Sequence, residues 1–201
     1  MFDIGGVLEH TPPTGHTQRW EQALGLEPGE LDRRMDDVWR AGRLGTVSEA
    51  EVVAAVGSRL RLTRVQVEDF MAGRWEEYLG TPNTDLIAWF AALRPQFRTG
   101  ILSNSFVGAR AREEQRYGFG ALADVVVYSH EVGIAKPDPA VYLLVCERLE
   151  VPPEEAVFLD DKVVAVEAAR AVGLTGVLFG ETAQAIADLE AVLGRTISRP
   201  G

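Results

Sequence analysis

The chain has 201 residues, is 46% hydrophobic and carries a formal net charge of −10. This length suits one domain or a domain with an inserted lobe, and the acidity argues against nucleic acid or an anionic membrane as a partner. The single cysteine, Cys146, excludes an internal disulfide and a cysteine-based zinc site, and it suits core packing on a predicted helix. No apolar run reaches membrane-spanning length and no signal-peptide pattern is found, so we expect a cytoplasmic protein, either a monomer or a homodimer.

The first predicted strand is short, because only Met1 and Phe2 precede Asp3. Strands usually run to five or six residues, and the central strand of a parallel sheet should not be the weakest. We therefore expect the natural start of the chain to lie upstream of Met1, or the chain to have been trimmed. Sequencing the native N-terminus tests this expectation.

Residues 11–80 show the pattern of a helical lobe and contain no convincing strand. In two of the predicted helices, Ser or Thr is followed three residues later by Glu or Gln, ahead of apolar residues. This arrangement is the capping box that marks a helix start. Because the helices are inserted between the first strand and the rest of the chain, they predict a lobe above the strand ends. They start near Thr17, Pro28, Ser48 and Thr63.

The rest of the chain alternates between strands and helices. The strands are short, continuously apolar and rich in Val, Ile, Leu and Phe, which is typical of a parallel sheet buried on both faces. The alternation predicts right-handed crossovers and an α/β fold with a doubly wound parallel sheet, formed by residues 1–10 and 81–201. The predicted strands are 99–102, 124–128, 156–159 and 176–179, and the predicted helices are 105–117, 139–149, 162–172 and 182–193.

Polar side chains stand at the ends of three predicted strands, at Asp3, Ser103 and Asp160. Ligands of doubly wound sheets bind at the carboxyl ends of the strands, so we expect these side chains to meet there. Lysine is rare in this chain, yet Lys136 lies in a loop near the same edge, and its ammonium suits a phosphate oxygen or a carboxylate. A carboxylate, a hydroxyl, an ammonium and the acidic pair Asp160-Asp161 suit Mg²⁺-assisted attack on a phosphorus atom.

Four motifs in this order resemble those of the haloacid dehalogenase-like (HAD) hydrolase superfamily, and the resemblance covers nearly the whole chain. The first motif of the superfamily is a hydrophobic residue followed by Asp-x-Asp-x-Thr/Val. This chain has Asp3 at the first acidic position and Gly5 at the second. One motif alone would be weak evidence, but four in order, each in the right strand or loop context, are strong. The other three are matched by Ser103-Asn104, Lys136-Pro137-Asp138-Pro139 and Asp160-Asp161.

The resemblance implies a role for each matching residue. It makes Asp3 the nucleophile that forms an aspartyl-phosphate, and Lys136 the cation that neutralises Asp3 and the phosphate. Ser103, with the main-chain amide of Asn104, would hold a phosphate oxygen. Residues 11–80 would be a helical cap of the C1 type on a Rossmann-like core. The Mg²⁺ ligands would be Asp3, Asp160, Asp161 and the main-chain carbonyl of Gly5.

The sequence leaves three functions open. The leading hypothesis is a Mg²⁺-dependent phosphatase for a small phosphorylated metabolite, slowed because Gly5 replaces the acid–base carboxylate of the phosphatases that the chain resembles. A 2-haloacid dehalogenase would use the same nucleophile on carbon and also lacks an acid at position 5. However, it needs no metal, and the acidic pair would repel the carboxylate of a haloacid. A non-catalytic protein that binds phosphate or a partner would also fit this scaffold.

The remaining polar and aromatic residues have structural interpretations. The histidines show no zinc-site spacing, and surface positions are expected for His10 and His16. Arg40 and Arg43 are expected to be solvated, although either could reach an anionic substrate. Lys162 is expected to be a solvated residue of a first helical turn. The apolar faces of the lobe helices are expected to include Trp20, Trp39 and Trp75.

Overall fold

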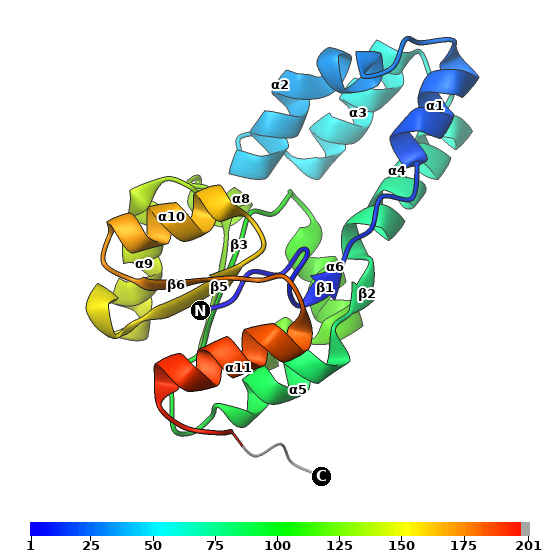
Figure 1. Ribbon diagram of the computed structural model, residues 1–201. Helices are drawn as coiled ribbons and strands as arrows, with labels where there is room; N and C mark the ends of the chain where they lie inside the picture. The colour runs from blue at the N-terminus through cyan, green and yellow to red at the C-terminus, as the bar shows by residue number, and fades with distance from the viewer. Residues whose placement is uncertain (198–201) are drawn as a thin grey trace.

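A computed structural model describes residues 1–197 of the chain (Figure 1). Its core is a parallel sheet built around the first three residues. Phe2 pairs with Ile101 on one side and with Leu159 on the other, so the start of the chain lies between two longer strands. The sheet order is therefore β4, β3, residues 1–3, β5, β6. The strands are β3 (Gly100–Ser103), β4 (Val125–Tyr128), β5 (Val157–Asp160) and β6 (Thr175–Leu178).

Helices cover both faces of the sheet, which confirms the doubly wound α/β fold expected from the sequence. Neighbouring residues of a strand point to opposite faces, and Ile101 and Leu102 accordingly pack into two different apolar clusters. In Figure 1, α5 and α11 lie on one side of the sheet, and α9 and α10 lie on the other. The helices of the core are α5 (Thr84–Ala92), α6 (Ala109–Tyr117), α7 (Phe119–Leu122), α8 (Ser129–Val132), α9 (Pro139–Leu149), α10 (Val163–Ala171) and α11 (Thr182–Leu193), with a 3-10 turn at Pro153–Glu155.

A lobe of helices projects from the core (Figure 1). These helices surround their own apolar cluster, which includes the fully buried Leu31, Val52 and Phe70. The chain leaves the core and returns to it through a short antiparallel ribbon, in which Glu9 pairs with Pro82. The elements of the ribbon and lobe are β1 (Glu9–His10), α1 (His16–Leu24), α2 (Glu30–Leu44), α3 (Glu49–Leu60), α4 (Arg64–Leu79) and β2 (Thr81–Pro82).

The helix starts of the lobe follow the sequence signals. The capping boxes predicted at Ser48 and Thr63 are both formed, and they satisfy amides of the first turns of α3 and α4. In the core, Asp138 caps α9 with Pro139 at the first helical position, as predicted. Local side chain–backbone hydrogen bonds are thus well determined by the sequence.

The helix after β3 begins later than the sequence indicated. The predicted helix 105–117 starts only at Ala109. The residue before it, Gly108, adopts a left-handed conformation with φ of 90°, so the helix cannot extend toward Ser105. The amide of Ser105, which would have belonged to the predicted first turn, instead donates to Ser129 Oγ (2.9 Å). Residues 104–108 are therefore a loop at the edge of the sheet, free to contact both the core and the lobe.

This loop ties the lobe to the core. Phe106 and Val107 pack into the apolar cluster of the lobe, and the amide of Val107 donates to the carbonyl of Gly42 in α2 (3.1 Å). Beside it, Ser129 Oγ donates to the carbonyl of Arg43 (2.8 Å). The lobe is thus held against the carboxyl edge of the sheet at the end of α2 as well as through the ribbon.

One expectation about the lobe is wrong. His16, expected on the surface, is 2% exposed, because its ring packs on Phe70 and its Nε2 lies 2.9 Å from the carbonyl oxygen of that residue. Trp39 and Trp75 are buried in the lobe as expected, and Trp20 packs against the same apolar cluster. Within residues 1–197, no helix combines the length and the apolar character needed to cross a bilayer.

Candidate active site

Three neighbouring strands of the sheet deliver Asp3, Ser103 and Asp160 to one edge. The backbone pairing sets their ends level, since the amide of Asp3 donates to the carbonyl of Leu159 (3.0 Å) while the amide of Leu102 donates to the carbonyl of Phe2 (2.9 Å). All three polar side chains are buried, and Asp160 has no exposed surface. The structure therefore brings together two carboxylates and a hydroxyl at the carboxyl end of a parallel sheet, where such folds bind ligands.

Lys136 joins the two carboxylates. Its Nζ lies 2.7 Å from Asp3 Oδ1 and 2.6 Å from Asp160 Oδ2, and its side chain is 3% exposed. A buried ammonium is stable only beside anions that replace its hydration. The contact thus fixes the position of the Asp3 carboxylate as well as that of the lysine.

Asn104 positions the loop that carries Lys136. Its Nδ2 donates to the carbonyl of Lys136 (2.8 Å), and its Oδ1 accepts from the amide of the same residue (2.8 Å). The sequence suggested a role only for the main-chain amide of Asn104. A two-point clamp between two loops leaves no sequence pattern, so it becomes visible only in the structure.

The electrostatics of Asp3 reflect two opposing influences. Burial raises the pKa of Asp3, and the adjacent Lys136 ammonium offsets part of that rise, while the nearby Asp160 adds to it. The carboxylate is thus poorly hydrated but held by a cation. Poor hydration leaves a carboxylate oxygen more available as a nucleophile, provided that a charged partner keeps it ionised.

The same edge holds a set of oxygens that suits a divalent cation. One carboxylate oxygen each from Asp3, Asp160 and Asp161 lies within 4.8 Å of the others. Among residues 1–197, the buried Asp161 Oδ1 makes no hydrogen bond, and Asp161 Oδ2 accepts from Lys162 Nζ (2.6 Å). Mg²⁺ is a hard cation that binds oxygen ligands, so a cluster of three carboxylates with one buried oxygen that lacks a hydrogen bond suits this ion.

Two adjacent glycines shape this edge in different ways. Gly6 has φ of 83°, and a Cβ on it would lie 2.7 Å from Asp161 Oδ2, so only glycine lets the acidic loop approach so closely. Gly5 has an ordinary φ, and a Cβ built on it meets no atom within 4 Å. The place of the missing carboxylate is thus open space rather than a position that a neighbouring side chain has filled.

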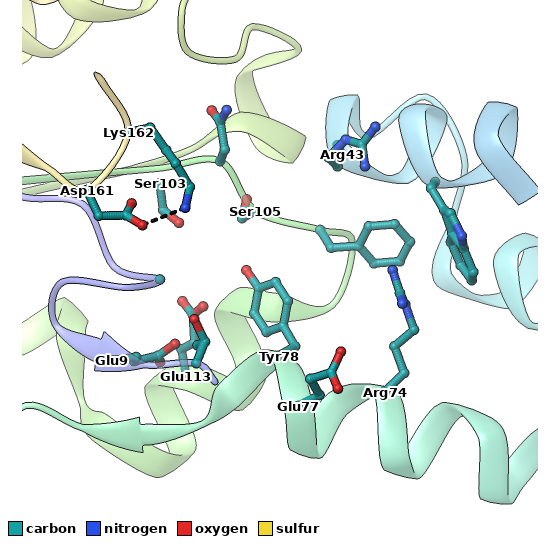
Figure 2. A pocket seen from close by; sticks show the side chains of 15 residues that line it. Glu9, Arg43, Arg74, Glu77, Tyr78, Ser103, Ser105, Glu113, Asp161 and Lys162 are labelled. Atoms are coloured by element: carbon teal, nitrogen blue, oxygen red, sulfur yellow. Dashed lines mark hydrogen bonds and ion pairs between the residues drawn. The ribbon is translucent and has the colours of Figure 1, made fainter. Parts of the chain in front are cut away.

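A cavity of about 380 Å³ lies between the sheet edge and the lobe (Figure 2). Ser103, Asn104, Asp161 and Gly5 line it on the core side. Lys162, expected to be solvated, is largely exposed but also borders the cavity. The lobe contributes Trp39, Arg43, Arg74, Glu77 and Tyr78.

The lobe residues of the cavity were mostly missed by sequence reasoning. Arg43 was expected to be solvated; it is exposed and faces the cavity, whereas Arg40, one turn earlier, forms an ion pair with Asp36. Arg74 and Tyr78 lie one turn apart on α4, and a spacing of four residues was the only signal that could have placed them on one face.

Two buried acids, Glu9 and Glu113, form part of the cavity wall near Tyr78 (Figure 2). Burial raises the pKa of Glu9 to about 9 and that of Glu113 to about 7. Neither carboxyl oxygen of Glu113 makes a hydrogen bond of normal geometry within residues 1–197, although the hydroxyls of Tyr78 and Tyr128 lie near enough to lower its pKa. At neutral pH Glu9 is therefore protonated and Glu113 partly so, and the two residues add less negative charge to the cavity than two ordinary carboxylates would.

The raised pKa of Glu113 predicts a pH-dependent loss of stability that Glu113→Gln removes. The pKa of the carboxyl is 4.5 when unfolded and about 7 when folded, so the folded state bears no ionisation penalty below pH 4.5 and the full penalty above pH 7. That penalty is on the order of 3 kcal/mol. Relative to wild type, the variant should gain stability between pH 5 and pH 8 in urea unfolding. Parallel pH profiles for the two proteins would show that Glu113 does not titrate in this range.

A five-stranded parallel core, an Asp-Lys-Asp cluster at its carboxyl edge and a helical lobe over that edge together define a hydrolase of the haloacid dehalogenase-like type. The chain belongs to this family: the family model described as haloacid dehalogenase-like hydrolase matches residues 1–173. The resemblance drawn from the motifs is therefore confirmed.

Particular relatives refine this assignment. Phosphatase MT3486 of Mycobacterium tuberculosis is 35% identical over 92% of this chain and 88% of its own length. Bifunctional epoxide hydrolase 2 of Sus scrofa is 29% identical over 96% of this chain, which spans 38% of that protein. Among solved structures, the HAD family enzyme bt-2542 of Bacteroides thetaiotaomicron, in complex with magnesium and inorganic phosphate, aligns with a TM-score of 0.73 at 19% identity, covering 89% of this chain and 92% of that one. The last likeness shows the shared fold.

Proposed function

We propose that the protein is a Mg²⁺-dependent phosphatase that hydrolyses a small phosphorylated metabolite through an aspartyl-phosphate on Asp3. The observation that carries this proposal is the contact of Lys136 Nζ with both Asp3 and Asp160, which holds the buried Asp3 carboxylate close to Asp161, a residue of the cavity wall. The phosphatase from Mycobacterium tuberculosis, by its name, and the Bacteroides enzyme, by its bound phosphate and magnesium, support the same reaction class.

In the proposed reaction, a carboxylate oxygen of Asp3 attacks phosphorus, and the bond from phosphorus to the leaving oxygen breaks. Lys136, at 2.7 Å from Asp3 Oδ1, keeps the nucleophile ionised and compensates charge on the transferring group. Ser103 Oγ, at the end of β3, would donate to a phosphate oxygen. Water then cleaves the acyl phosphate, which releases inorganic phosphate and restores Asp3.

Asp3, Asp160 and Asp161, with the main-chain carbonyl of Gly5, would hold Mg²⁺. The ion would neutralise charge on the phosphate oxygens and so lower the electrostatic cost of an anion approaching several carboxylates. The Asp160 carboxylate also accepts from the amide of Lys162 (2.8 Å), which starts α10 and fixes the acidic loop against the sheet.

The metal assignment predicts the effect of Asp161→Asn. This substitution removes a charge from the proposed site but leaves the contacts of Lys136 with Asp3 and Asp160 in place. We expect Mg²⁺ affinity, measured by calorimetry, to fall by at least about tenfold. The control is Asp69→Asn, at an exposed position on α4. An unchanged dissociation constant for Mg²⁺ in the Asp161 variant would remove Asp161 from the metal site.

The proposal assigns residues 11–80 the role of a cap. The lobe roofs the cavity, and the contacts of Val107 and Ser129 with the end of α2 hold it there. A roofed cavity of about 380 Å³ excludes large substrates such as folded proteins and favours small metabolites.

A single assay compares the phosphatase with the dehalogenase. Purified protein is incubated with p-nitrophenyl phosphate or with 2-chloropropionate, each with and without Mg²⁺. We expect phosphate release that depends on Mg²⁺, and no chloride release, because three clustered carboxylates disfavour a haloacid. Chloride release without metal would replace the phosphatase by a dehalogenase, and inactivity on both substrates would count against this reaction class.

A further inference from the structure

Two arginines at the lobe end of the cavity form no ion pair with an acidic side chain within residues 1–197. Arg43 at the end of α2 and Arg74 on α4 both border the cavity, on the side across from Asp161 and Lys162 (Figure 2). Within residues 1–197, neither guanidinium makes a hydrogen bond or an ion pair. Other arginines behave differently: Arg59 and Arg112, for example, pair directly with acids.

Arg74 is held in place without being neutralised. Its guanidinium lies over the ring of Trp39, 4.4 Å from the ring centroid, and this cation–π contact holds the cation at the cavity wall. Burial lowers the pKa of Arg74, Asp32 and Glu77 raise it, and the charge of Arg43 lowers it further. A poorly hydrated cation that also feels a second cation is stabilised by any anion placed between them.

The acids of the cavity leave this end positive. Glu77, the nearest cavity carboxylate of the lobe, is already bound by the amide and hydroxyl of Thr14. Glu9, with its pKa raised to about 9, is protonated at neutral pH, and Glu113, with its pKa raised to about 7, is only partly ionised. In a chain with a formal charge of −10, a concave surface with two unpaired guanidiniums is a local exception, which points to an anionic ligand.

We propose that Arg43 and Arg74 form a second anion subsite, which binds a carboxylate or a further phosphate of the substrate while its phosphate ester lies at Asp3. This inference rests on the proposed phosphatase function and narrows its substrate class to phosphate esters that carry another negative group. The planar guanidinium of Arg74 suits the two oxygens of such a group, and Phe106, which also lines the cavity, offers an apolar wall for the part between the two anions.

The test compares three aryl phosphates that differ in one para substituent: 4-carboxyphenyl phosphate, 4-carbamoylphenyl phosphate and 1,4-phenylene bisphosphate. The amide has the shape of the carboxylate without its charge. Dissociation constants are measured by calorimetry on Asp3→Asn protein with Mg²⁺, which reports binding without turnover. We expect the carboxylate, the bisphosphate or both to bind about tenfold more tightly than the amide. The stronger of the two identifies which anion the subsite takes.

Arginine variants test whether Arg43 and Arg74 cause the tighter binding of the charged probes. In Arg74→Gln and in Arg43→Gln, the ratio of the dissociation constants of the amide and the charged probe should fall to less than about twofold. Arg40→Gln is the matched control, because Arg40 lies on the same helix as Arg43 but pairs with Asp36 away from the cavity. Two arginine variants are used so that the test survives if one of them fails to fold.

The outcomes separate this inference from the proposed function. Equal binding of the amide and both charged probes to protein with intact arginines, or a preference that survives both arginine variants, would overturn the subsite alone. Charge-dependent binding that requires the arginines, together with no phosphate release by wild type, would keep the subsite and reject the phosphatase. If none of the probes binds, both proposals fail.

Discussion

Asp3→Asn is expected to reduce Mg²⁺-dependent hydrolysis of p-nitrophenyl phosphate by at least about 10³-fold, because the substitution removes the nucleophilic charge and changes the shape little. Lys136 would keep its partner Asp160 at 2.6 Å, so the buried cation is not stranded. The measurement is kcat at saturating substrate, with rapid quench to detect a phosphorylated protein. Wild type should form an acid-stable, hydroxylamine-sensitive phosphate adduct, and the variant should form none.

The control for this variant must separate catalysis from folding. Asp69→Asn makes the same chemical change at an exposed position of the lobe and should keep full activity. Thermal unfolding of the Asp3 variant should lie close to that of wild type, because the variant relieves repulsion between Asp3 and Asp160 while it loses one contact of Lys136. Retained turnover in a folded Asp3→Asn protein would end the aspartyl-phosphate mechanism.

The sequence predicted the core well because local and periodic signals dominate there. Strands buried on both faces are apolar throughout, and β3 and β5 were located to within one residue. The central strand is as short as the sequence suggested, and it is held by pairing on both sides of Phe2 rather than by its own length. Backbone pairing with residues far along the chain thus holds a segment that is too short to be recognised as a strand from its own sequence.

Elements without a periodic pattern were missed. α5 is apolar over much of its surface, with Leu86, Trp89 and Phe90 buried, and so shows no amphipathic stripe. The start of α6 was placed too early because Gly108 was not recognised as a stop. The burial of His16 could not be anticipated, because it depends on packing against Phe70 more than fifty residues away.

The residues of the candidate site also differ in whether the sequence could predict their positions. The motif residues at strand ends could be placed from the sequence, because parallel strands bring their carboxyl ends to one edge. The clamp of Asn104 on Lys136 and the buried pair Glu9 and Glu113 could not, since each joins segments that are far apart along the chain. The position of the Arg74 guanidinium likewise depends on its contact with Trp39, which lies on another helix.

Gly5→Asp is the second substitution with a large expected effect, and it should raise activity. The phosphatases that the chain resembles carry at this position an acid that protonates the leaving group, and general acid catalysis contributes roughly 10²–10⁴-fold. Gly5 lies in the cavity wall, has an ordinary φ, and offers open space, since a Cβ at this position would have no neighbouring atom within 4 Å. The first side-chain atom of an Asp is therefore accommodated without a clash, and we expect the variant to fold as wild type does.

The gain should depend on the leaving group. An aryl oxygen leaves readily without a proton, whereas an alkyl oxygen does not, so wild type should prefer p-nitrophenyl phosphate and the variant should gain chiefly on an alkyl phosphate, by roughly 10²-fold. Gly5→Asn fills the same space without an acid, and Gly180→Asp adds the same acid at another open glycine outside the cavity. Both controls should leave the aryl-to-alkyl ratio unchanged.

A measurement on wild type alone could contradict the prediction for Gly5. If it already hydrolyses alkyl and aryl phosphates at similar rates, another group supplies the proton and the open space at Gly5 does not limit turnover. Glu113 is then the first residue to test, because its pKa of about 7 suits proton transfer at neutral pH and its carboxyl lies in the cavity wall. In that case Glu113→Gln should lower alkyl phosphate hydrolysis selectively, and Gly5→Asp should restore it in the double variant.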